Sequence, residues 1–199
     1  VRENVPLTTG SLWFRFSAND GSGHILIDDL RIYEGTKPRE EKAQSKEENL
    51  YKVTFDEETN HILNNVQFNT EFVDSVEKIP EGYSIEPDPA NPTNQCLKIS
   101  TTNAFKRIKW GKVDTETNKQ VVYEFELSAD PDEYVHKKIR VVSYNGSADH
   151  LKLVGNATEK GKATFSAGTA TVCAGEWIKV WVAVDYETMK YKIWTGDGD

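Results

Sequence analysis

Two glutamates in the segment YEFELS, residues 123–128, stand at a spacing that acid–base chemistry can use. Glu124 and Glu126 alternate with aromatic residues, so on a strand both project from one face. Residues two apart lie about 6.6–6.8 Å apart along a strand, and the paired carboxyls of a retaining glycosidase stand about 5–5.5 Å apart. The alternative, which we favour, is a solvated strand face with Lys138 and Arg140 nearby on another strand.

Tryptophans supply a second candidate chemistry, the stacking of flat rings on sugars. Trp177 and Trp181 lie on one face of a predicted strand with Lys179 between them, opposite an Ile/Val face. Trp194 shares its face of the next strand with lysines, and Trp110 ends another predicted strand. These residues predict a ligand-binding platform. The other interpretation is that the rings cover a core or a module interface, which is the usual fate of tryptophan.

Asp28 and Asp29 form a third candidate site because they interrupt an otherwise apolar strand, His24–Tyr33. Strict alternation divides the apolar residues of this strand into two faces, Leu26, Leu30 and Ile32 on one and Ile25 and Ile27 on the other. A buried carboxylate needs a partner. We expect that partner to be a hydrogen bond or salt bridge from a neighbouring strand.

The elements that position these residues are predicted to be short strands. The stretch Gly175–Asp199 indicates two strands joined by a turn at residues 186–188. Residues 11–17 and 24–33 indicate a hairpin, residues 66–73 a single strand, and the proline-rich segment 79–94 a loop. No long segment holds a helical period, so the sequence predicts an antiparallel β-sandwich.

Composition excludes several classes of function. The 199 residues carry a net charge of −8, which argues against binding to a nucleic-acid backbone. No apolar run approaches the roughly 20 residues of a membrane span. Cys96 and Cys173 either pair or remain buried free thiols, and we favour free thiols.

The C-terminal pattern "Gly-Glu-Trp, alternating strand, Asp-Tyr, turn, strand, Gly-Asp-Gly" (175–199) resembles the paired inner strands of concanavalin A-like, laminin-G-like β-sandwiches. The order of the chain is rotated relative to such jelly-roll modules. LYKVTFDE at residues 50–57 resembles their first strand, whereas residues 8–34 resemble their final hairpin.

Two arrangements fit this rotated order, a circularly permuted module and a piece of a tandem array. We expect residues 1–36 to form a hairpin that completes a sandwich in cis, 37–48 to form a charged linker, and 49–199 to form the sandwich body. The chain begins without a signal peptide and ends at a turn, which predicts that it is a fragment of a longer protein.

The resemblance implies a non-catalytic carbohydrate-binding module of a secreted or cell-surface, multimodular bacterial protein. Its partners would be a polysaccharide and adjacent modules of the parent chain. In such modules an Asp-Asp strand commonly meets the acidic end of the first strand around a structural Ca²⁺. That implicates Asp28 or Asp29 with Asp56 or Glu57, whose oxygens suit calcium.

Two alternatives stay open. One is a structural or adhesive repeat that binds protein or spaces other domains, whose signature would be Trp177, Trp181 and Trp194 buried at an interface. The other is a fragment of a glycoside hydrolase or polysaccharide lyase. The endo-β-glucanases of this fold resemble Glu-x-Asp-x-x-Glu, but residues 124–129 read Glu-Phe-Glu-Leu-Ser-Ala, without the central Asp. We therefore expect no catalysis.

Overall fold

A computed structural model gives the fold of the protein. It describes residues 2–6, 12–18, 22–39, 49–56, 66–68, 71–73, 79, 81–102, 105–110, 113–129, 137–143, 148–155, 162–165, 171–173 and 177–196. Side chains are described at residues 24–39, 49–56, 79, 81–100, 113–128, 177–192, 194 and 196. Every regular element in these ranges is a β-strand, so the prediction of an all-β fold is confirmed for this part of the chain.

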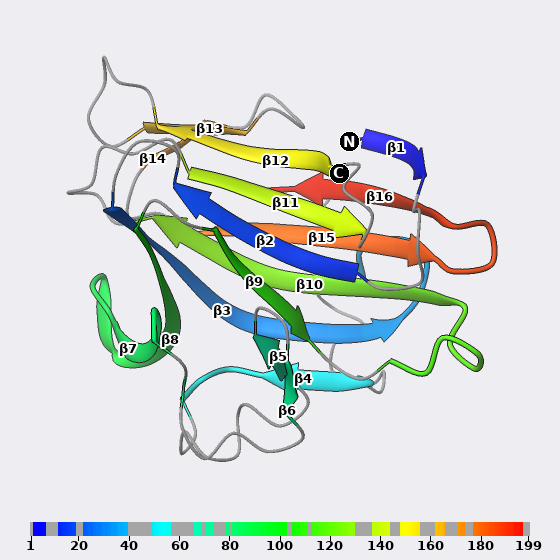
Figure 1. The fold of residues 1–199 in the computed structure, drawn as a ribbon, viewed down its shortest axis with the longest axis horizontal. Coiled ribbons are helices and arrows are strands. Elements are labelled where there is room, and N and C mark those ends of the chain that lie inside the picture. Colours follow the sequence, from blue (N-terminus) through cyan, green and yellow to red (C-terminus); the bar gives the residue numbers. More distant parts are fainter. Residues whose placement is uncertain are drawn as a thin grey trace.

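The first sheet carries most of the candidate residues. Its strands are β1 (Arg2–Pro6), β3 (Ser22–Glu34), β4 (Tyr51–Val53), β7 (Tyr83–Asp88), β8 (Asn91–Thr102), β10 (Gln120–Ala129), β15 (Ile178–Asp185) and β16 (Lys190–Thr195). They pair antiparallel in the order β1-β16-β15-β10-β3-β8-β7 (Figure 1). The short strand β4 pairs with the second half of β3. β3 therefore lies inside this sheet, between β10 and β8.

The second sheet is also antiparallel. Its strands are β2 (Leu12–Ala18), β5 (Val66–Phe68), β6 (Glu71–Val73), β9 (Phe105–Trp110), β11 (Lys137–Ser143), β12 (Ala148–Gly155), β13 (Lys162–Phe165) and β14 (Thr171–Cys173). Their order is β14-β13-β12-β11-β2-β9-β5-β6. In Figure 1, β2, β9 and β11 pass in front of the first sheet, and β2 contacts β8 of that sheet.

Three expectations about single elements were wrong. β2 and β3 lie in different sheets, so they do not form the expected hairpin. Residues 66–73 form two strands, β5 and β6, which pair with each other. The proline-rich segment forms β7 and the start of β8 instead of a loop. Pro87 is tolerated because β7 is an edge strand, where a missing N–H need not break a ladder.

A β-bulge at Asp29–Leu30, opposite Phe125 of β10, shifts the side-chain alternation of β3. Glu124 of β10 pairs with Arg31, whereas Glu126 pairs with Asp28, so two residues of β3 face one residue of β10. Asp29 has a φ of 45°, the left-handed conformation that such a bulge needs. The two faces expected from strict alternation were therefore wrong.

One face of the first sheet forms the main core. The bulge brings the apolar residues on both sides of it onto this face. The side chains with no exposed surface here are Ile25, Ile27, Leu30, Ile32, Leu97, Ile99, Val121, Phe125, Leu127, Val180 and Val182. Each such side chain contributes about 1.5–3 kcal/mol when fully buried. The main core thus fixes β3, β8, β10 and β15 relative to one another.

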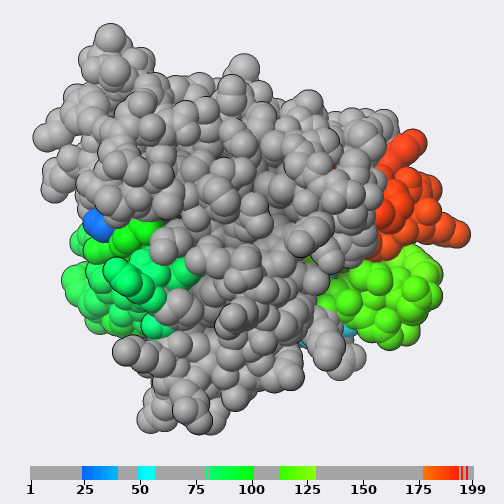
Figure 2. Space-filling model, in the orientation of Figure 1, coloured from blue at the N-terminus to red at the C-terminus, as the bar shows by residue number. Residues whose placement is uncertain are grey.

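Two turns lie side by side at one end of the first sheet. The Tyr186 N–H donates to the Lys119 carbonyl oxygen at 2.8 Å, which joins residues 113–119 to residues 186–189. Figure 2 shows these turns at one end of the molecule, and the β7–β8 hairpin at the other. Glu116 lies on the first of these turns, with a side chain that is 93% exposed.

Candidate functional site

The face of the first sheet opposite the main core carries a row of polar and aromatic side chains. Arg31 of β3 pairs with Glu124 of β10, which pairs with Trp181 of β15, which in turn pairs with Trp194 of β16. Side chains at paired positions of neighbouring strands lie about 4.5–5.5 Å apart at Cβ. The four residues therefore form a continuous row across four strands. We call this surface the second face.

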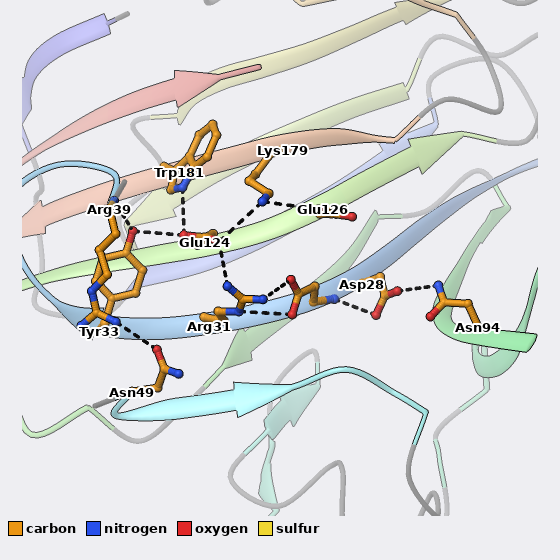
Figure 3. A network of polar contacts seen from close by, with 11 residues as sticks. Asp28, Arg31, Tyr33, Arg39, Asn49, Asn94, Glu124, Glu126, Lys179 and Trp181 are labelled. Atoms are coloured by element: carbon orange, nitrogen blue, oxygen red, sulfur yellow. Dashed lines mark hydrogen bonds and ion pairs between the residues drawn. The ribbon is translucent and has the colours of Figure 1, made fainter. Parts of the chain in front are cut away.

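Glu124 stands at the centre of the second face, and its side chain is only 1% exposed. Its Oε2 accepts two hydrogen bonds, from the Trp181 indole N–H at 2.9 Å and from the Tyr33 hydroxyl at 3.1 Å (Figure 3). Hydrogen bonds to an ionised acceptor are among the stronger ones in proteins. These donors hold one oxygen of the carboxylate in place.

The other oxygen of Glu124, Oε1, is buried and has no hydrogen-bond partner among the described residues. Arg31 Nη1 lies 3.6 Å away and Lys179 Nζ 4.0 Å away. Both distances exceed those of ordinary N–H···O bonds, about 2.7–3.2 Å. Leaving a buried acceptor unsatisfied costs about 1–3 kcal/mol, and more for a charged group. Oε1 therefore marks a position where a hydrogen-bond donor would be stabilising.

Partly exposed charged side chains lie beside Glu124. Lys179 Nζ is 3.6 Å from Glu126 Oε1, and their side chains are 22% and 31% exposed. Arg31 binds Asp29 through Nη2 at 2.5 Å and Nε at 3.2 Å, and both are about one-fifth exposed. Burial raises the pKa of Glu126, and the nearby Lys179 opposes that shift. These four residues form the partly exposed part of the second face next to Glu124.

Tyr33 is held by the segment that follows β3. Its hydroxyl accepts from the Arg39 backbone N–H at 3.2 Å, so its own proton points to Glu124. The Arg39 guanidinium lies 3.8 Å from the centre of the Tyr33 ring and donates to Asn49 Oδ1 at 3.2 Å. Burial and the Glu124 charge raise the pKa of Tyr33, which keeps the phenol protonated.

The expected solvated face around Glu124 was wrong. Glu124 is buried, and its cationic neighbours are Arg31 and Lys179. Lys138 and Arg140 belong to β11 in the second sheet. Arg31 and Tyr33 alternate along the sequence after Asp29, which indicates that they share one face of the strand. The bulge made it impossible to predict from the sequence that this is the face of Glu124.

The structure places the predicted ligand-binding residues in different environments. Trp181 and Trp194 are 4% and 9% exposed, so neither ring offers an open stacking surface. Trp177 is half-buried, and its indole donates to Asp88 Oδ2 at 3.0 Å. Lys179 Nζ lies 4.0 Å from Glu124 Oε1. Trp110 belongs to β9 of the second sheet, and its side chain lies outside the described residues.

The predicted calcium ligands make contacts with protein donors. Asp28 Oδ1 accepts from the Asp29 N–H, and its Oδ2 accepts from Asn94 Nδ2, both at 2.7 Å. Asp56 accepts from the Gln95 N–H at 2.8 Å. Among the described residues, no group of three or more His, Cys, Asp or Glu side chains could hold a metal ion.

These contacts leave the calcium ligands engaged. Asp29 binds Arg31, and Glu57 lies outside the described residues. Asp28 and Asp29 therefore fit a bulge held by hydrogen bonds and an ion pair better than a cation site. The calcium site stays a prediction.

Cys96 is a buried free thiol. Its Sγ lies 3.4 Å from the Glu86 carbonyl oxygen, and burial raises its pKa to about 12. A thiol with so high a pKa is a poor nucleophile. The side chain of Cys173 lies outside the described residues.

The chain matches no protein-family model, no curated protein and no solved structure. Among the described residues no helix is long and apolar enough to cross a membrane. The chemistry of the second face therefore rests on its own contacts.

Proposed function

We propose that the chain is a non-catalytic carbohydrate-binding module and that it binds its glycan at the second face, beside Glu124. The observation that carries this proposal is the buried Oε1 of Glu124, which has no hydrogen-bond donor among the described residues and lies 3.6 Å and 4.0 Å from two cations. A sugar hydroxyl both donates and accepts. One hydroxyl can therefore donate to Oε1 while it accepts from Arg31 or Lys179.

The surroundings of Glu124 suit a sugar in two further ways. Carboxylates and guanidinium groups form the planar, bidentate hydrogen bonds that suit neighbouring hydroxyls. The half-buried indole of Trp177 belongs to the residue just before β15, the strand that carries Lys179. The contact surface in this proposal is mainly polar, and the rings of Trp181 and Trp194 are buried next to it.

The proposal includes the β-sandwich architecture of the jelly-roll, concanavalin A-like kind. Support comes from the two antiparallel sheets and from the fully buried apolar face of the first one. It also comes from the contact between β2 and β8, which belong to different sheets. A secreted or cell-surface location and neighbouring modules remain predictions from the sequence resemblance.

Glu124 and Glu126 are proposed to act in binding, not in catalysis. They project from the same face of β10, and Lys179 lies within 4.0 Å of both. A general acid must deliver a proton to its substrate. Glu124 is unsuited to that task because hydrogen bonds from Trp181 and Tyr33 already hold one of its carboxylate oxygens.

Affinity electrophoresis in gels that contain soluble polysaccharides tests the proposal. We expect the wild-type chain to be retarded by at least one polysaccharide, and Glu124→Gln and Lys179→Ala to lose most of that retardation. Glu116→Gln is the matched control, since it removes the same charge from the turn before β10. Circular dichroism of each variant establishes that it is folded. A folded wild-type chain that no polysaccharide retards would overturn the proposal.

The second candidate is a structural or adhesive repeat. The observation that favours it is the burial of Trp181 and Trp194 within the chain, which leaves neither ring open for stacking on a sugar. A repeat of this kind would migrate independently of every polysaccharide while remaining folded. The same electrophoresis therefore distinguishes the two candidates.

A further inference from the structure

Charged side chains of both signs lie around Glu124. Those nearest to it are the carboxylates of Asp29 and Glu126 and the cations of Arg31 and Lys179. Figure 3 shows Arg31 and Lys179 beside Glu124, with Glu126 next to Lys179. Each of these two cations thus lies within 4.0 Å of two carboxylates of the chain.

The cations in this set already face carboxylates of the chain. Arg31 binds Asp29 at 2.5 Å and lies 3.6 Å from Glu124. Lys179 lies 3.6 Å from Glu126 and 4.0 Å from Glu124. To bind Arg31 or Lys179, a carboxylate or sulfate on a ligand would have to displace one of these protein carboxylates. It would also face Glu124, a second anion whose side chain is only 1% exposed.

A cationic ligand meets the opposite obstacle. An ammonium group that approached Glu124 Oε1 would enter between Arg31 and Lys179, which stand 3.6 Å and 4.0 Å from that oxygen. Like charges this close repel strongly where water is excluded. A neutral hydroxyl adds no charge and still satisfies Oε1.

We propose that the glycan bound beside Glu124 is uncharged, an inference that rests on the proposed function. The ligand class is a polymer of neutral sugars with free hydroxyls, as opposed to a polyuronate, a sulfated glycan or an amino-sugar polymer. Glu124 accepts from one hydroxyl, and Arg31 and Lys179 donate to the same or a neighbouring hydroxyl.

Isothermal titration with soluble probes of each charge tests this inference. The neutral probes are β-glucan, mannan and galactan, the anionic probe is polygalacturonate, and the cationic probe is chitosan. Titrations at low salt and at about 0.5 M NaCl separate long-range repulsion, which salt screens, from contacts at the site. We expect one neutral probe to bind at least about tenfold more tightly than either charged probe at both salt concentrations.

Two variants with the same change in net charge locate the effect. Glu126→Gln removes a carboxylate from Lys179, so the preference for neutral over anionic probes should fall about threefold or more. Glu116→Gln, on the distant turn, should leave that preference unchanged. Equal effects of both variants would show that net charge sets the preference and would overturn the inference.

The outcomes separate the two proposals. If polygalacturonate or chitosan binds as tightly as the neutral probes or more tightly, this inference fails and the carbohydrate-binding proposal stands. If a folded chain binds no probe of any charge, both fail.

Discussion

Glu124 has an environment that its sequence position does not reveal. It alternates with core residues on β10, so the strand pattern places it on the face opposite the main core. In most antiparallel sheets that face is solvated. Here Trp181, Tyr33 and Val122 surround it with apolar surface, and the carboxylate is buried. The pairing of strands far apart in the chain produces this burial, and no local pattern predicts it.

The hydrogen bond from Trp181 to Glu124 should be measurable as stability. We expect Trp181→Phe to destabilise the protein by about 1–3 kcal/mol more than Trp194→Phe, since it also removes a donor from a buried carboxylate. Trp194→Phe is the control because it makes the same truncation in the same cluster, one strand farther from Glu124. Urea denaturation gives both values. Equal losses would mean that this bond contributes nothing.

Asp28 should make stability depend on pH. Burial raises its folded-state pKa from 3.8 to about 6, so the folded protein holds this proton more tightly than the unfolded chain. The stability that this group gives at low pH is therefore lost as the pH rises from about 4 to 6. Above pH 6 the buried, ionised carboxylate lowers the stability of the folded state by the full amount. We expect Asp28→Asn to gain about 1–3 kcal/mol at pH 7.5 and almost nothing at pH 4.

Denaturation of wild type and Asp28→Asn at both pH values checks this prediction. Asp114→Asn is an internal control of opposite sign. Hydrogen bonds from Thr117 and the Glu116 N–H lower the Asp114 pKa, so its contribution is lost as pH falls. A loss of stability in Asp28→Asn at pH 7.5 would contradict the prediction and would mean that the ionised carboxylate stabilises the bulge.

At the scale of elements, the sequence predicted most strands but not the point where β3 changes phase. Ile25 and Ile27 are out of step with Leu30 and Ile32, and all four reach the core only because of the bulge. The pair Asp28–Asp29 was the signal, since Asp tolerates the left-handed conformation better than most residues. The same shift puts Arg31 on the face of Glu124.

The bulge predicts a difference between two small residues at position 29. Asp29→Ala and Asp29→Gly both remove the carboxylate that binds Arg31. Only alanine carries the Cβ that is unfavourable at a φ of 45°. We expect the alanine variant to be about 1 kcal/mol less stable than the glycine variant in urea denaturation. Equal stabilities would indicate that β3 lacks the bulge in solution.

For the whole molecule, the sequence predicted the fold class but not which strands share a sheet. Composition and alternation are local, whereas the sheet order joins β3 to β10 and β8 across long stretches of chain. The prediction that the N-terminal segment completes a sandwich in cis stays open. The place of β3 inside the first sheet, between β10 and β8, makes it testable.

Deletion of residues 1–36 should prevent cooperative folding, because it removes β3 and leaves β10, β8 and β4 without their shared neighbour. Deletion of residues 1–6 is the control, since it removes only the edge strand β1. Thermal unfolding followed by circular dichroism distinguishes the two chains. If residues 37–199 melted as cooperatively as the full chain, the first segment would not be an integral strand of the sheet.

The central claim is that Glu124 on the second face receives a neutral glycan. The most direct measurement is the tryptophan emission of the folded chain during titration with soluble neutral polysaccharides, for wild type and Glu124→Gln. Because Trp181 donates to Glu124, a hydroxyl bound at Oε1 changes the surroundings of that indole. We predict a saturable change in wild-type emission that Glu124→Gln abolishes. Emission that stays constant with every polysaccharide would contradict the claim and favour a structural repeat.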